Sequence, residues 1–272
     1  MRHLRQNYVN WVARLCAPLD GRFPLLQNNI RKERGTKLDE TRSRRHEKIR
    51  KIAGNVLFFS LLLSTVYAFI RFLLAPEQVP EGATHINLKS DYLLMLVQCL
   101  LGILVMSLPS VLTRRWNITI ASPIYILYYV FLYCAVFLGE VFEFYETVPH
   151  WDTMLHFFSG MMLCALGFIL VDMLNRSEKI RLKLSPVFVA LFAFCFSLSC
   201  GAIWEIYEYT VDCVMGLNMQ KYLDPQGIVR IGQTALRDTM KDIIMDAAAA
   251  LLISVIGLIT TRRQKEPARP TN

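Results

Sequence analysis

Paired cysteine motifs are missing from this sequence. None of its seven cysteines has a partner at the spacing of a disulfide framework or a zinc ribbon. Four of them, Cys99, Cys134, Cys164 and Cys195, lie inside apolar stretches, where a free cysteine behaves as a small hydrophobic side chain. Cysteine therefore gives no lead to function.

A cleavable leader and an internal repeat are also lacking. The N-terminus has no uninterrupted apolar region followed by a small-residue cleavage site, so we expect the mature chain to begin near Met1. No self-similarity of solenoid period is visible, which excludes a repeat array.

Excess charge is absent from most of the chain. Residues 1–51 hold 14 Lys and Arg against 5 Asp and Glu, so they account for the formal net charge of +8. A basic segment beside an apolar span is typical of a cytosolic retention signal near anionic headgroups, and we expect no nucleic-acid partner. Apolar residues at helical spacing between Leu4 and Leu15 fit either a helix on the membrane surface or a disordered tail.

Hydrophobic residues make up 54% of the chain and gather in long runs. A bilayer core is crossed by about 20 helical residues. Six stretches reach that length: 53–75, 91–113, 121–145, 151–174, 186–212 and 236–261. The sequence therefore predicts an all-α polytopic membrane helix bundle, with a basic segment at 1–52, a six-helix domain at 53–261 and a tail at 262–272.

Basic residues in the loops predict the orientation. Arg114 and Arg115, the group from Arg176 to Lys183, and the group from Arg262 to Lys265 all follow even-numbered spans. Basic loops stay in the cytoplasm, so both termini should be cytoplasmic. The loop from Cys213 to Ala235 is long for a tight connection, and long loops are often functional.

Acidic residues gather at the opposite, outer ends of the later spans, in LGEVFEFYE, WDTMLHFFSG, GAIWEIYEYTVD and RDTMKDIIMD. Carboxylates near a bilayer core are costly and mark functional sites by default. Asp152 and His156 are four residues apart, and Gly201, Glu205, Glu208 and Asp212 share one helix face. Asp238, Asp242 and Asp246 run about 12 Å along the last helix. These stripes should face an inner polar cavity, because a lipid-facing stripe of acids is implausible.

The acids outnumber the nearby bases, and a divalent cation would remove the deficit. Magnesium, manganese, zinc and iron all remain open. The predicted metal ligands are Asp152, His156, Glu205, Glu208, Asp242 and Asp246. Glu208 and Asp242 are the predicted catalytic residues, and Arg230, Arg237, Asp212 and Asp238 the predicted substrate-binding residues. For Asp152 a helix cap, and for Asp238 a helix-dipole contact, are equally simple readings.

At WDTMLHFFSGMM, GAIWEIYEY and DTMKDIIMD the sequence resembles the YjdF-like family of uncharacterised bacterial inner-membrane proteins, through residue 261. That resemblance implies the membrane fold and no particular activity. The order of Asp152, His156, a Glu-bearing helix and an acidic stripe is more distantly similar to VanZ-like envelope proteins. Glu208 and Asp242 or Asp246 stand where that pattern has Gln and Asn, so the similarity implies a link to the cell envelope alone.

Three functions are compatible with these residues. The first is a membrane enzyme that binds a divalent metal and acts on a lipid-linked or phosphorylated, anionic envelope substrate. The second is a cation or proton transporter or channel that uses the acidic stripe as a pathway. The third is a noncatalytic envelope partner protein whose acids fix helix packing.

Overall fold

A computed structural model describes residues 30–77, 87–116, 120, 122–176, 184–224 and 227–265. In these residues six helices are long and apolar enough to cross a membrane. The described residues form no sheet, and Leu223 and Val229 form an isolated antiparallel bridge. The spans are Thr41–Leu74, Lys89–Arg115, Ser122–Val141, Trp151–Asp172, Pro186–Met215 and Gln233–Arg262. The predicted all-α polytopic membrane bundle is confirmed. The predicted surface helix near Leu4 and the last residues of the tail lie outside the described residues.

Two compact units make up the fold. The first contains the beginning of α2 (Ile30–Leu74) up to Phe59 together with residues Ile103–Val130, which include α4 (Leu108–Trp116). α2 continues without a break through residue 52, so residues 30–52 of the basic segment run as helix directly into the first span. α3 (Lys89–Met106) begins in the second unit and ends in the first. α5 (Ser122–Leu132) begins in the first unit and ends in the second.

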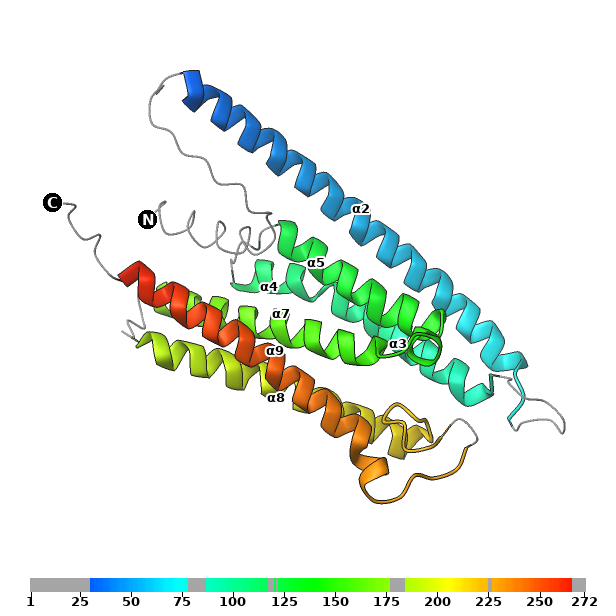
Figure 1. Ribbon diagram of the computed structural model, residues 1–272. Coiled ribbons are helices and arrows are strands. Elements are labelled where there is room, and N and C mark those ends of the chain that lie inside the picture. The colour runs from blue at the N-terminus through cyan, green and yellow to red at the C-terminus, as the bar shows by residue number, and fades with distance from the viewer. Residues whose placement is uncertain are drawn as a thin grey trace. The chain divides into compact units, whose positions relative to one another are not determined.

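The second unit is built around α7 (Trp151–Arg176), α8 (Pro186–Met215) and α9 (Gln233–Lys265), which lie side by side in Figure 1. Small residues allow the close approach of these helices, as is usual between membrane helices. A side chain at Gly167 would meet the backbone of Ala193, and one at Gly257 would collide with Phe168. The buried core of this seam is Cys164, Phe168, Ala190, Ala193, Ala250 and Ile253.

The third span ends earlier than residue 145, where the sequence placed its end. α5 passes into a π-helical segment, η1 (Tyr133–Val141), in which the Phe142 N–H donates to the Phe137 carbonyl. Glu143 then adopts a left-handed conformation with φ of 57°, and a separate turn, α6 (Phe144–Thr147), follows. Apolar composition continues through Phe144, and it cannot reveal this change of backbone path.

Candidate metal centre

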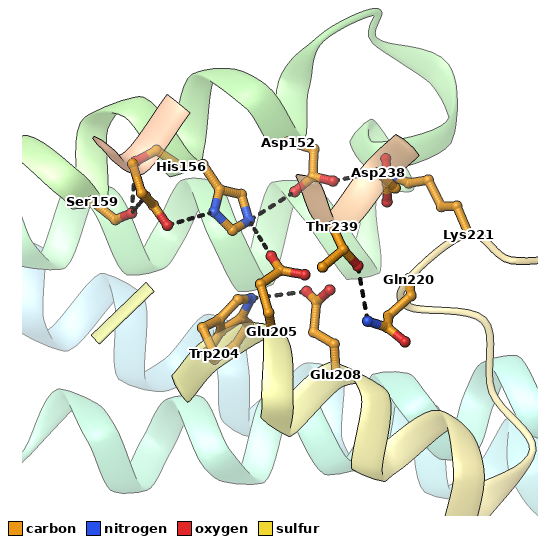
Figure 2. Close-up of polar contacts among 11 residues, drawn as sticks. Asp152, His156, Ser159, Trp204, Glu205, Glu208, Gln220, Lys221, Asp238 and Thr239 are labelled. Atoms are coloured by element: carbon orange, nitrogen blue, oxygen red, sulfur yellow. Dashed lines mark hydrogen bonds and ion pairs between the residues drawn. The ribbon is translucent and has the colours of Figure 1, made fainter. Parts of the chain in front are cut away.

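One end of the second unit collects acidic side chains from three helices. α7 and α9 begin at this end and α8 finishes there, so the acids of all three helices meet (Figure 2). Glu205, Asp242 and Asp246 are 4%, 3% and 1% exposed, and His156 is buried among them. Spacing of three to four residues explains the convergence, because it keeps each stripe on one helix face.

His156 stands at the centre of the cluster. Its Nδ1 lies 3.3 Å from Asp246 Oδ2, and its Nε2 lies 3.7 Å from Asp152 Oδ1 and 3.9 Å from Glu205 Oε1. If Nδ1–H donates to Asp246, the Nε2 lone pair points at carboxylate oxygens. Such an arrangement needs a positive group, either a proton or a metal ion, between Nε2 and those oxygens.

Three potential ligand atoms lie close enough to share one ion. Asp152, His156 and Asp242 each offer one atom within 4.8 Å of the other two. A metal about 2.1 Å from each ligand keeps neighbouring ligand atoms roughly 3 to 4 Å apart, so the widest separation would have to contract by about 1 to 2 Å for the three atoms to share one ion. This group could hold a metal ion.

Two buried carboxylates in the cluster have oxygens that form no hydrogen bond within the described part of the chain. Among the described residues, the two carboxylate oxygens of Glu205 have no hydrogen-bond partner. The same holds for the Oδ1 of Asp242. Buried polar atoms are nearly always hydrogen-bonded, and a bare buried carboxylate is more costly than a neutral group. These oxygens therefore have free capacity to bind a cation or a proton.

Asp246 lies at the deep side of the cluster and is enclosed by its neighbours. Ser159 Oγ donates to Asp246 Oδ1 at 3.4 Å, while the other carboxylate oxygen faces His156. A Cβ at Gly201 would collide with the Asp246 carboxylate. Gly201 thus makes the space in which Asp246 can reach the imidazole.

Lys221 comes from the loop after α8 and lies beside Asp152 and Asp238 of the cluster (Figure 2). Its Nζ lies 2.6 Å from Asp152 Oδ2 and 3.5 Å from Asp238 Oδ2. Burial lowers the pKa of Lys221, but the carboxylates of Asp152 and Asp238 raise it by more, so the pKa lies above its ordinary value and the ammonium stays charged.

The sequence analysis missed Lys221 and named Arg230 and Arg237 as the basic residues of the site. Lys221 is 69 residues from Asp152, and no helical spacing links the two residues. The only available signal was the excess of acid, which required a cation from somewhere.

Glu208 and Asp212 continue the α8 stripe toward the loop, but they have different partners. Trp204 Nε1 donates to Glu208 Oε1 at 2.8 Å. The Asp212 carboxylate accepts the backbone N–H groups of Met219 and Gln220 at 2.8 and 2.9 Å. Asp212, predicted to bind substrate, therefore holds the beginning of the loop in this structure.

Neither of the two predicted substrate arginines forms an ion pair with the described acids of the cluster. Arg230 is half-buried in the loop, where its N–H donates to the Tyr222 carbonyl. Arg237 is exposed on α9 and lines a groove of about 480 Å³ together with Lys241 and apolar residues such as Met240 and Ile244.

Tyr145 is a further group near the acids that sequence reasoning passed over. Burial raises the pKa of Tyr145 well above its ordinary value, and the charges of Glu140, Asp152, Glu208 and Asp242 raise it further. Its ring packs where a side chain on Gly139 would otherwise lie. The phenol is therefore a neutral hydroxyl beside the cluster, held there by the turn that follows η1.

Comparisons with known proteins agree with the membrane fold. The sequence model of a family described as "Predicted membrane protein (DUF2238)" matches residues 56–263. A Thermotoga maritima protein described as uncharacterized is 30% identical over 110 residues, which is 40% of this chain and 48% of the relative. The chain thus aligns with about half the length of that relative. No solved structure matches.

Proposed function

The chain belongs to the DUF2238 family of predicted membrane proteins, and from that premise we propose that it is a metal-dependent enzyme of the bacterial inner membrane. It binds one divalent ion between α7, α8 and α9 and hydrolyses a lipid-linked or phosphorylated envelope substrate. The observation that carries the proposal is the convergence of Asp152, His156 and Asp242 beside the unpartnered carboxylate of Glu205.

The contacts of four predicted residues support their roles at the ion. Asp152, His156 and Asp242 bind the ion, and Glu205 supplies a fourth ligand. Asp246 accepts the Nδ1 proton of His156, as carboxylates do behind metal-bound histidines. A divalent ion held there would supply a bound water of lowered pKa and would polarise a phosphoryl oxygen.

Glu208 lies at the outer edge of this group and acts as the general base. It would accept a proton from the water that adds to phosphorus, while the bond from phosphorus to the leaving oxygen breaks and that oxygen takes a proton from solvent. The Trp204 N–H orients the Glu208 carboxylate. The groove beside Arg237 and Lys241 supports an anionic substrate, because it combines two cations with apolar walls that suit a lipid chain. Arg230 would reach the headgroup from the loop.

Transport through the acidic stripe is less well supported. A pathway needs polar groups across the whole membrane. Beyond Asp246 the seam between the three helices is packed by buried apolar residues such as Ala249, Ala250 and Phe168, and its buried hydroxyls, Ser197 and Ser254, donate to backbone carbonyls. Flux of protons or divalent cations into liposomes that disappears in Asp242→Asn would favour transport over the enzyme.

A noncatalytic partner protein is the other alternative. Acids that only fixed helix packing would be hydrogen-bonded, whereas Glu205 and Asp242 have unpartnered buried oxygens. On the packing reading, Glu205→Gln and Asp242→Asn should preserve both folding and phenotype.

Elemental analysis of the detergent-purified full chain tests the metal centre. We expect about one divalent ion per chain in the wild type, and a loss of most of it in His156→Ala and Asp242→Ala. Glu146→Gln is the matched control, because Glu146 is an exposed acid outside the cluster. Full metal content in both site variants would show that the proposed ligands are wrong.

Hydrolysis is tested with phosphatidic acid and a polyprenyl phosphate in mixed micelles. We expect release of phosphate that depends on the metal and falls by about a hundredfold or more in Glu208→Gln, which retains the ion. Equal rates in Glu208→Gln and wild type would remove Glu208 as the base.

A further inference from the structure

A second pocket lies in the other compact unit, between α2, the end of α3 with α4, and the beginning of α5. Its volume is about 500 Å³. Every residue that lines it belongs to the first unit, so the pocket is independent of the metal centre. Arg50 and Phe58 mark its α2 wall, Met106 and Arg114 the second wall, and Tyr125 the third.

The charge of this pocket has one sign. Arg50, Lys51 and Arg114 line it, and no Asp or Glu does. Lys51 forms an ion pair with Glu47 at 3.1 Å on the surface of α2. In the part of the chain that the structure describes, no carboxylate lies within ion-pairing distance of Arg50 or Arg114. Two guanidinium groups are thus available to one anion.

Aromatic and hydroxyl groups hold this basic wall in place. The Arg50 guanidinium carbon lies 5.0 Å from the centre of the Tyr125 ring, in a cation–π contact. The Tyr125 hydroxyl and Thr113 Oγ1 are 2.9 Å apart. A Cβ at Gly54 would lie 3.1 Å from the Tyr129 ring, so the absence of a side chain there lets Tyr129 lie against α2. These contacts hold the Arg50 and Tyr125 walls of the pocket together.

The pocket is amphipathic along the membrane normal. Arg50 precedes Phe58 by eight residues, or about 12 Å of helix, toward the basic end of the first span. Arg114 similarly lies near the end of the second span, whereas Met106 lies deeper. Charged groups at the mouth and apolar groups below match a lipid with an anionic headgroup.

We propose that this pocket binds a phosphate-bearing anion, supplied by the headgroup of an anionic glycerophospholipid of the surrounding leaflet. Two arginines can form charge-assisted hydrogen bonds to one phosphodiester, and Phe58 and Met106 contact the first part of an acyl chain. The bound lipid links α2, α4 and α5 at the membrane surface.

Neighbouring cations provide a matched comparison. Arg45 and Arg115 lie on the same helices, α2 and α4, are exposed, and do not line the pocket. The double variant Arg45→Gln/Arg115→Gln therefore makes the same change of charge as Arg50→Gln/Arg114→Gln without touching the pocket.

Native mass spectrometry of the full chain in a non-ionic detergent, titrated with short-chain phosphatidylglycerol, tests the site. We expect saturable binding of about one lipid, weakened about tenfold or more in Arg50→Gln/Arg114→Gln and by less than about twofold in the control pair. Metal content should be equal in both pairs. Unchanged binding in the pocket variant, or equal weakening in both pairs, overturns the proposal.

Two further titrations distinguish the source of the phosphate. Glycerol 3-phosphate should bind at least about tenfold more weakly than the lipid, and zwitterionic phosphatidylcholine should not compete. Glycerol 3-phosphate binding as tightly as the lipid, with the same dependence on Arg50 and Arg114, overturns the lipid assignment in favour of a soluble phosphate. If the double variant unfolds, Arg114→Gln alone makes the test, because this exposed side chain can be changed without disturbing the core.

Discussion

Asp246 is the most buried acid of the cluster, and its contacts indicate a role that differs from that of the other carboxylates. It contacts His156 Nδ1 and Ser159, and Gly201 leaves room for it. An oxygen already engaged with Nδ1 fixes the ring and leaves Nε2 for the ion. We therefore place Asp246 behind the metal ligands, although the sequence analysis grouped it with them.

Replacement of Asp246 by Asn tests this position. The amide keeps the volume but lacks the charge that polarises the imidazole, so metal affinity should fall roughly 10- to 100-fold without being abolished. The measurement is competition with a fluorescent chelator in detergent. Ser254→Ala is the control, because Ser254 is also buried on α9 but donates to the Ala190 carbonyl in the seam. An affinity loss in Ser254→Ala as large as in Asp246→Asn would contradict the assignment.

Individual residues of the site were predictable where helical spacing applies. The pairs Asp152 with His156 and Asp242 with Asp246 follow from a separation of four residues. Lys221 could not be predicted, because its contact with Asp152 depends on the path of a loop. The partners of Asp212 were hidden for the same reason, since they are backbone groups of the turn after α8.

At the scale of elements, the junction between α8 and the following loop is tightly organised. Gly216 ends α8 in a left-handed conformation with φ of 68°, and its N–H donates to the Asp212 carbonyl. The Asp212 carboxylate accepts two more N–H groups, and Lys221 has a φ of 50°. A left-handed lysine is held only by its surroundings, so these contacts position the ammonium.

Removal of the Asp212 carboxylate should release this part of the loop. In Asp212→Ala we expect the amides of residues 217–224 to exchange hydrogen about tenfold or more faster, because two charge-assisted hydrogen bonds worth about 1.5 to 3 kcal/mol each are lost. Hydrogen–deuterium exchange with mass spectrometry measures this directly. Glu208→Gln serves as the control on the same helix, and unchanged exchange in Asp212→Ala would exclude the capping role.

The elements were predictable in number and less so at their ends. Apolar length determines the six spans because the bilayer core sets a minimum. The early end of the third span depends on a π-helical register and on the left-handed Glu143, which composition does not encode. The start of α2 could not be predicted from apolar composition either, because its first residues are basic.

At the scale of the whole molecule, the basic segments and the acidic cluster fall at opposite ends of the spans. With basic loops retained inside, both termini should be cytoplasmic and the metal centre should face outward. Fusion of green fluorescent protein to the C-terminus should fluoresce in a bacterial host, and fusion of alkaline phosphatase there should be inactive. Insertion of the phosphatase after Gly227, an exposed loop residue, is the complementary control and should be active. The reverse pattern would place the acids on the cytoplasmic side.

The ammonium of Lys221, held between Asp152 and Asp238, gives this centre a built-in counter-ion. When the proposed metal departs, the carboxylates of α7 and α9 still share a resident positive charge. When the metal ion binds or leaves, the carboxylates exchange one positive partner for another and are never left without a counter-ion. Three helices that would otherwise repel one another can stay assembled while the ion comes and goes.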